Sequence, residues 1–116
     1  MCSIIGFSGK EIAAPIIVKG LKRMEYRGYD SVGVATESDN RIELKKGTGK
    51  VSEVNSKVQL DSMPGKVGIG HTRWATHGKV TEENAHPHPS NSGKIAIVHN
   101  GIIENFEELK KQLENE

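Results

Sequence analysis

The sequence has few of the residues that build a large hydrophobic core. Only 34% of its 116 residues are hydrophobic and 4% are aromatic, whereas close to half of a typical globular domain is apolar. The single cysteine, Cys2, excludes an intrachain disulfide and any zinc or iron–sulfur site built from cysteines. We therefore expect a thin core, with one face buried against something outside these residues.

The sequence also lacks an excess of charge of either sign and lacks long apolar runs. It has 16 basic and 15 acidic residues, without a charge block that would capture nucleic acid or an anionic membrane. Its apolar runs fall far short of the ~20 residues that span a bilayer, and its first residues lack the features of a secretory signal. We expect a cytoplasmic protein that binds neither nucleic acid nor membrane.

The apolar periodicity predicts an α+β chain with mainly antiparallel strands. Alternating patterns predict strands over residues 3–8, 31–37, 41–47, 66–71 and 94–100. Helical spacing predicts helices over residues 12–28, 51–60 and 106–116, the last capped by Asn105. Residues 72–93 are rich in Thr, His, Asn, Pro and Gly, which predicts a long loop of the kind that often carries function.

Cys2 follows the initiator methionine and precedes an apolar strand. Removal of Met1 would give Cys2 both a thiol and a free α-amine, whose reference pKa of about 7.7–8.0 suits a base near neutral pH. A nucleophile and a base would then share one residue, as in N-terminal nucleophile enzymes. The alternative is a small buried hydrophobe without chemistry.

A polar and aromatic cluster, GHTRWATHG, follows the strand predicted at residues 66–71. Arg73 carries a planar fork of donors that can grip a carboxylate. Thr76 and His77 add polar groups, and Trp74 adds a large rigid surface. The alternative is a structural loop with an arginine on its surface.

The segment VHNGIIENFEEL places Asn100 and Gly101 at the end of a strand. A side-chain amide beside a backbone N–H supplies two donors, as an oxyanion hole requires. Asn-Gly is also the commonest hairpin turn, which leaves a purely structural role open.

Two further motifs are candidates for structural roles. In NAHPHPS, His86 and His88 could ligate a metal, but the prolines stiffen the segment and no acidic ligand lies at metal spacing, so we expect no metal site. In EYRGYDS, Arg27 and Asp30 can pair, and we expect the motif to support the corner between helix and strand.

The segments MCSI, EYRGYDS, HTRWATHG, NAHPHP and VHNGIIEN, in this order and spacing, resemble the N-terminal glutaminase domain of the class II glutamine amidotransferases. The resemblance runs along essentially the whole chain. Within the family, Trp-Ala-Thr-His is typical of the branch that converts fructose 6-phosphate to glucosamine 6-phosphate. The resemblance implies an N-terminal-nucleophile fold of four layers, αββα, with stacked, mainly antiparallel sheets, of which residues 1–116 would form the N-terminal part.

The resemblance also implies the catalytic roles. Cys2 would attack the side-chain amide of glutamine, with its own α-amine as the base once Met1 is removed. Asn100 and Gly101 would hold the oxyanion of the tetrahedral intermediate. A γ-glutamyl thioester would form, release ammonia and be hydrolysed to glutamate.

Substrate binding is implied in the same way. Arg73 would bind the α-carboxylate of glutamine, helped by Thr76 and His77. Trp74 would lie beside the pocket, where family members gate the outlet for ammonia. The resemblance implies neither a cofactor nor a metal.

The chain is shorter than the family's glutaminase domain, so it is expected to be a truncated domain. The missing part would include the acidic residue that receives the α-amino group of glutamine. The ammonia would pass to a sugar-phosphate isomerase domain of the same polypeptide, a homo-oligomer at full length. Alternatives are a non-catalytic half-domain that needs its complement, the glutaminase domain of another class II amidotransferase, and a histidine-based metal-binding module.

Overall fold

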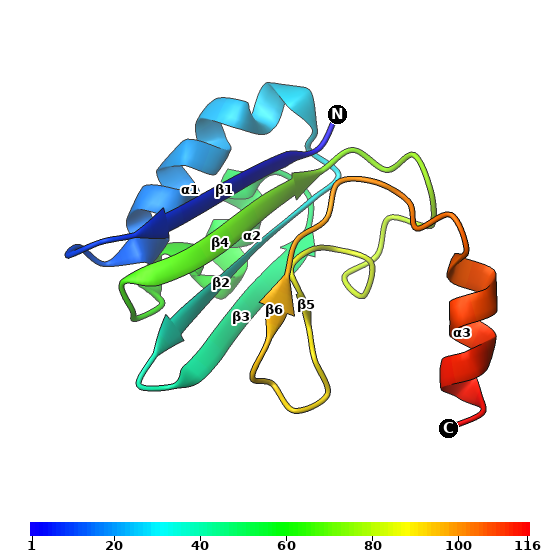
Figure 1. Cartoon of the computed structure of the whole chain (residues 1–116). Helices are drawn as coiled ribbons and strands as arrows, with labels where there is room; N and C mark the ends of the chain where they lie inside the picture. The colour runs from blue at the N-terminus through cyan, green and yellow to red at the C-terminus, as the bar shows by residue number, and fades with distance from the viewer.

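The computed structural model describes residues 1–116 as an antiparallel sheet with two helices on one face and a third helix apart from it (Figure 1). The sheet has four strands in the order β1-β4-β2-β3. These strands are β1 (Ser3–Ser8), β2 (Ser31–Ser38), β3 (Arg41–Thr48) and β4 (Val67–Arg73). The helices are α1 (Ala13–Met24), α2 (Val51–Val58) and α3 (Phe106–Glu114), with short 3-10 turns at Glu25–Arg27 and Leu60–Ser62. A second, two-stranded sheet pairs β5 (His88–Pro89) with β6 (Ala96–Ile97).

The core lies between α1, α2 and the helix-facing side of the sheet. Ile17 and Leu21, one helical turn apart on α1, are fully buried. The core cluster contains 11 of the 116 residues. Its members are Ala13, Ala14, Ile17, Val18, Leu21, Val32, Val34, Val51, Val54, Leu60 and Met63.

The alternation of side chains along each strand decides what the other face of the sheet carries. Val32 and Val34 of β2 pack into the core, so Gly33, between them, faces away from the helices. Gly33 pairs with His71 of β4 and with Lys46 of β3, and Ser31 pairs with Arg73. We call this side the open face. Its end nearest the chain's amino terminus is polar.

The loop between β4 and β5 crosses the open face at Gly33. A Cβ atom on Gly33 would collide first with the carbonyl oxygen of His86, and would lie 2.9 Å from Pro87 Cδ. Lys46 Nζ donates to the carbonyl oxygens of Ala85, at 2.7 Å, and Pro87, at 3.2 Å. The absence of a side chain at position 33 therefore lets this loop lie directly on the sheet.

The structure confirms the α+β class and most predicted elements, and corrects others. The strand predicted over residues 94–100 is only the two-residue β6, because β5 is its sole pairing partner. β4 continues to Arg73, into the segment predicted as loop. Asn105 precedes α3, but its side chain makes no capping hydrogen bond.

Of the four layers implied by the resemblance, the chain contains one helical layer and its sheet, together with the small sheet of β5 and β6. Helix α3 stands apart from the sheet (Figure 1) and buries none of its residues. None of the helices is both long and apolar enough to cross a membrane.

Candidate functional site

A cleft of about 1010 Å³ opens beside the polar end of the open face. It is bordered by the start of β1, the segment that follows β4, the loop that leads into β5, and the segment between β6 and α3. Its lining includes six of the seven residues singled out from the sequence: Cys2, Arg73, Trp74, Thr76, His77 and Gly101. Segments far apart in the sequence thus meet at one cavity.

The sheet register brings Cys2 to the cleft. Ser3 pairs with Thr72, so Cys2 lies beside Arg73 when the register is continued by one residue. The Cys2 Sγ accepts the backbone N–H of Trp74 at 3.3 Å and lies 3.5 Å from the Trp74 carbonyl oxygen. The side chain is half-buried, so its thiol is held at the cavity wall and stays reachable.

Arg73 is nearly buried, with 7% of its surface exposed. Its Nη1 donates to the Lys79 carbonyl oxygen at 2.8 Å, and its Nη2 donates to the His77 carbonyl oxygen. A guanidinium has five N–H donors, so these bonds leave others for a ligand in the cleft. The Arg73 side chain therefore holds the loop after β4 through two of its carbonyl oxygens, and the same side chain lines the cleft.

Asp30, in the corner directly before β2, holds the loop after β4 by two hydrogen bonds. Asp30 Oδ2 accepts the backbone N–H of Ala75 at 2.7 Å, and the Asp30 N–H donates to the Arg73 carbonyl oxygen at 2.9 Å. Arg27, the partner considered for Asp30, instead lies against Met1, with its Nη2 2.6 Å from Sδ. Asp30 thus positions the segment that carries Trp74, Thr76 and His77.

Of the Asn100-Gly101 pair, only the glycine lines the cleft. Asn100 does not line the cleft, and its Oδ1 lies 2.7 Å from Nε2 of His71 on β4. Gly101 does line the cleft, and its φ of 151° lies in the region that favours glycine. No backbone hydrogen bond uses the Gly101 N–H, which leaves it available to a ligand.

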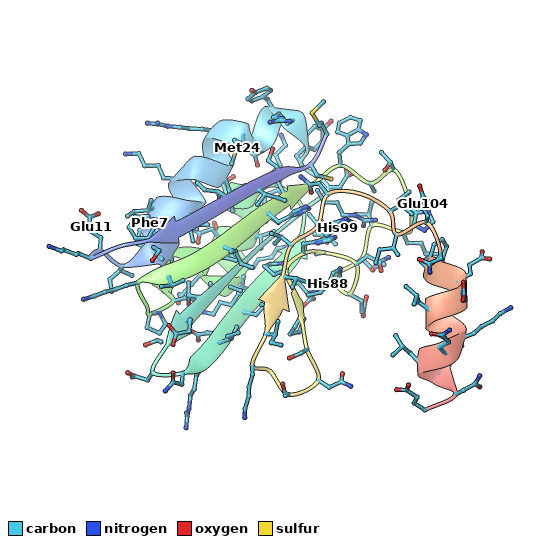
Figure 2. All side chains as sticks on the ribbon, viewed as in Figure 1. Phe7, Glu11, Met24, His88, His99 and Glu104 are labelled. Atoms are coloured by element: carbon cyan, nitrogen blue, oxygen red, sulfur yellow. The ribbon has the colours of Figure 1, made fainter.

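The rings of three histidines lie close together: His71 on β4, His86 in the loop before β5, and His88 on β5. The rings of His71 and His86 are 4.3 Å apart and nearly parallel, and His86 and His88 are also 4.3 Å apart. His86 Nδ1 accepts the His99 N–H at 3.3 Å. Figure 2 labels His88 beside the small sheet of β5 and β6, and His99 on the segment that leads from β6 to α3.

Burial keeps these rings neutral. Desolvation, together with the smaller effect of the neighbouring His71, His88, Arg73 and Lys46 charges, lowers the pKa of His86 to about 4. Desolvation also lowers the pKa of His71 and of His88. No set of three or more His, Cys, Asp or Glu side chains is arranged to hold a metal ion.

His71 was not singled out from the sequence, and Asp30 was expected only to support the helix-to-strand corner. His71 shares the GHTRWATHG cluster with Arg73, and its position two residues earlier puts both side chains on one strand face. That spacing was the available signal. The link from Asp30 to Ala75 spans 45 positions, so no local pattern could have revealed it.

Curated relatives of the chain share one activity in their names. The chain is 58% identical over 113 residues to the glutamine–fructose-6-phosphate aminotransferase (isomerizing) of Pyrococcus horikoshii. It is 60% identical over 113 residues to that of Methanococcus maripaludis and 52% identical over 116 residues to that of Aquifex aeolicus. The chain is a homologue of these class II glutamine amidotransferases. These alignments cover 97–100% of this chain.

The chain has the same fold as part of two solved enzyme structures. The glutamine phosphoribosylpyrophosphate amidotransferase of B. subtilis, complexed with ADP and GMP, matches 99% of this chain and 25% of its own, with a TM-score of 0.82 and 35% identity. A structure described as the allosteric regulatory enzyme of purine biosynthesis matches with a TM-score of 0.83 and 35% identity. The chain spans about a fifth of the length of its curated relatives, 19–20%. No family model matches it.

Proposed function

We propose that residues 1–116 belong to a glutaminase that hydrolyses the side-chain amide of glutamine and supplies the ammonia to fructose 6-phosphate. One observation carries the proposal: a single cleft gathers the only thiol of the chain, a nearly buried guanidinium and an unused backbone donor, from Cys2, Arg73 and Gly101. The aminotransferase relatives support the choice of glutamine as donor and of fructose 6-phosphate as acceptor.

Cys2 is the proposed nucleophile. While Met1 is attached, the nitrogen of Cys2 is an amide and has no basic lone pair. Removal of Met1 gives an α-amine whose reference pKa of about 7.7–8.0 allows it to take the thiol proton. The thiolate then attacks the amide carbon of glutamine, and the carbonyl oxygen becomes the oxyanion of a tetrahedral intermediate.

The leaving group departs in the next step. The α-ammonium of Cys2 returns its proton to the amide nitrogen, the carbon–nitrogen bond breaks, and ammonia leaves behind a γ-glutamyl thioester. Water, activated by the same amine, then hydrolyses the thioester to glutamate and restores the thiol. The balance is glutamine plus water to glutamate plus ammonia.

Arg73 is proposed to bind the α-carboxylate of glutamine. Its fork of donors matches a carboxylate in shape and charge, and its bonds to the loop fix its direction. Thr76 and His77, also in the cleft wall, are proposed to complete this subsite. Trp74, whose ring meets Tyr29 edge to face at 5.9 Å, is proposed to border the outlet for ammonia.

Asn100 and Gly101 are proposed to hold the oxyanion. The Gly101 N–H and the Asn100 side-chain Nδ2 are free of partners within the chain. Two such donors, aimed at the developing charge, are the usual means of stabilising a tetrahedral intermediate. The isomerase domain that would use the ammonia, and a homo-oligomeric state, remain predictions.

The test uses a polypeptide of the relatives' length that contains these residues, with Met1 removed. We expect glutamate release from glutamine in the wild-type protein, and its loss in Cys2→Ala. Retention of the Met1 residue should abolish activity equally, because it blocks the base and spares the thiol. Unchanged glutamate release in Cys2→Ala would refute the proposal.

A second candidate is a half-domain that is inactive without its complement. The observation that favours it is a set of large apolar side chains after β5 that are more than half exposed: Ile95, Ile97, Ile102, Ile103 and Leu113. Size-exclusion chromatography and amide hydrogen exchange of the 116-residue chain test it. A compact, protected monomer that turns over glutamine would exclude this candidate.

A further inference from the structure

The segment that carries Asn100 is attached to the sheet by side chains. No backbone hydrogen bond joins residues 98–101 to the four-stranded sheet. One side chain of the sheet and one of the loop hold the segment instead: His71 Nε2 on β4 bonds Asn100 Oδ1, and His86 Nδ1, in the loop before β5, accepts the His99 N–H. The orientation of the Asn100 amide therefore depends on His71.

Burial fixes which nitrogen of His71 carries the proton. His71 is 1% exposed, and its Nδ1 is buried without a hydrogen-bond partner. A buried N–H without an acceptor costs about 1–3 kcal/mol, so the proton belongs on Nε2. Because an amide oxygen only accepts hydrogen bonds, the Nε2–H donates to Asn100 Oδ1.

The protonation of His71 at Nε2 also determines where the Nδ2 of the Asn100 amide lies. With Oδ1 held by His71, the Nδ2 of Asn100 is not the atom directed at the ring, and it makes no hydrogen bond within the chain. If His71 were protonated at Nδ1 instead, the amide would turn its Nδ2 toward the ring and its oxygen toward the ligand. An oxygen at that place would repel an oxyanion.

We propose that His71 is a positioning residue that holds the Asn100 amide with its Nδ2 donors free for the oxyanion. The inference rests on the proposed glutaminase function and deepens it. The stack of His86 on His71 keeps the ring plane fixed, and the His86 bond to the His99 N–H fixes the adjoining backbone. Both rings act in their neutral forms and never exchange a proton with the substrate.

The test compares a tetrahedral ligand with a planar one. The γ-semialdehyde of L-glutamate adds the Cys2 thiol to form a hemithioacetal, which resembles the oxyanion intermediate, whereas L-glutamate adds nothing. Since the proposed role concerns only the tetrahedral state, His71→Leu should weaken semialdehyde binding and lower kcat by about 10- to 100-fold. The glutamine KM and the affinity for L-glutamate should change less than about twofold.

Companion variants separate positioning from folding. His71→Gln keeps an N–H donor and should recover most of the lost kcat. Thr72→Val, at the next position on β4 and buried on the opposite face, is the matched control and should leave every parameter unchanged. If His71→Leu does not fold, His71→Met takes its place, because methionine adapts to irregular space.

A double-mutant cycle tests whether His71 acts through Asn100. Adding His71→Leu to Asn100→Ala should cause no further loss of kcat if the two side chains form one device. Additive losses of kcat, or wild-type semialdehyde affinity in His71→Leu, would overturn the inference about His71. The proposed function would still stand in that case, provided that the wild-type protein hydrolyses glutamine. Absence of glutaminase activity in the wild-type protein would overturn both.

Discussion

The substitution Gly33→Ala tests how closely the loop of the site lies on the sheet. The added Cβ would collide with the carbonyl oxygen of His86, and would lie 2.8 Å from Lys46 Cβ and 2.9 Å from Pro87 Cδ. Two of these contacts involve backbone or a proline ring, which cannot rotate away. We therefore expect the loop to lift from the sheet rather than the new methyl group to find space.

The magnitude follows from the contacts that lifting would break. Lys46 would lose its bonds to the Ala85 and Pro87 carbonyl oxygens, each worth about 0.5–1.5 kcal/mol. The sum, about 1–3 kcal/mol, agrees with the usual cost of overpacking. Backbone strain adds nothing, because the φ of Gly33 lies outside the positive region.

Amide hydrogen exchange measures this local opening. The reporters are the N–H groups of Ala85, bonded to the Glu82 carbonyl oxygen, and His99, bonded to His86. A loss of about 1–3 kcal/mol raises their exchange rates about 5- to 150-fold. Gly6→Ala is the matched control, because its Cβ would meet only the Gly68 carbonyl oxygen, at 3.8 Å. Equal exchange in the two variants would refute the close packing of the loop.

Three further predictions concern the cleft. Arg73→Lys keeps the charge but loses the fork, so steady-state kinetics should show a glutamine KM about 10- to 100-fold higher with a smaller change in kcat. Asp30→Ala removes the acceptor of the Ala75 N–H, which should raise the same KM about 10-fold, whereas Asp30→Asn should restore it. Because the pKa of His86 is lowered from 6.5 to about 4, the unfolded chain binds this proton first as pH falls, so the free energy of unfolding should fall between about pH 6.5 and 4. Solvent screening of the half-buried ring reduces this loss to about 1–2 kcal/mol, and urea titrations at several pH values measure it.

Local sequence patterns predicted the elements whose conformation depends on the preferences of their own residues. The Asp39-Asn40 turn between β2 and β3 was predictable, because both residues tolerate positive φ, observed at 53° and 63°. Strand β6 was not, because a strand needs a partner, and β5 offers only two residues for pairing. An alternating pattern states which face a side chain would take, but not whether a neighbouring strand exists.

The sequence motifs predicted which residues form the site, but not the hydrogen bonds that hold these residues in place. The seven candidates came from motifs that lie far apart in the sequence, and six of them line one cleft. The bond from Asn100 to His71 spans 29 positions, and that from Ala75 to Asp30 spans 45. The Asp30 link follows from the register of β2 and β4, which pairs Ser31 with Arg73, and the His71 link joins two side chains outside any strand pairing; local spacing contains neither.

The low hydrophobic content of the chain has a physical explanation in the open face. A sheet covered on both sides needs apolar residues at nearly every strand position, whereas a sheet with one covered face needs them at alternate positions. Near the cleft, the positions that face away from the helices are occupied by Arg73, His71, Gly33 and Lys46. Replacing them by apolar residues would enlarge the core, but it would remove the guanidinium, the amide-holding imidazole, the space for the loop and the ammonium that ties the loop down. The thin core predicted from composition is thus a consequence of building the site directly on the strands.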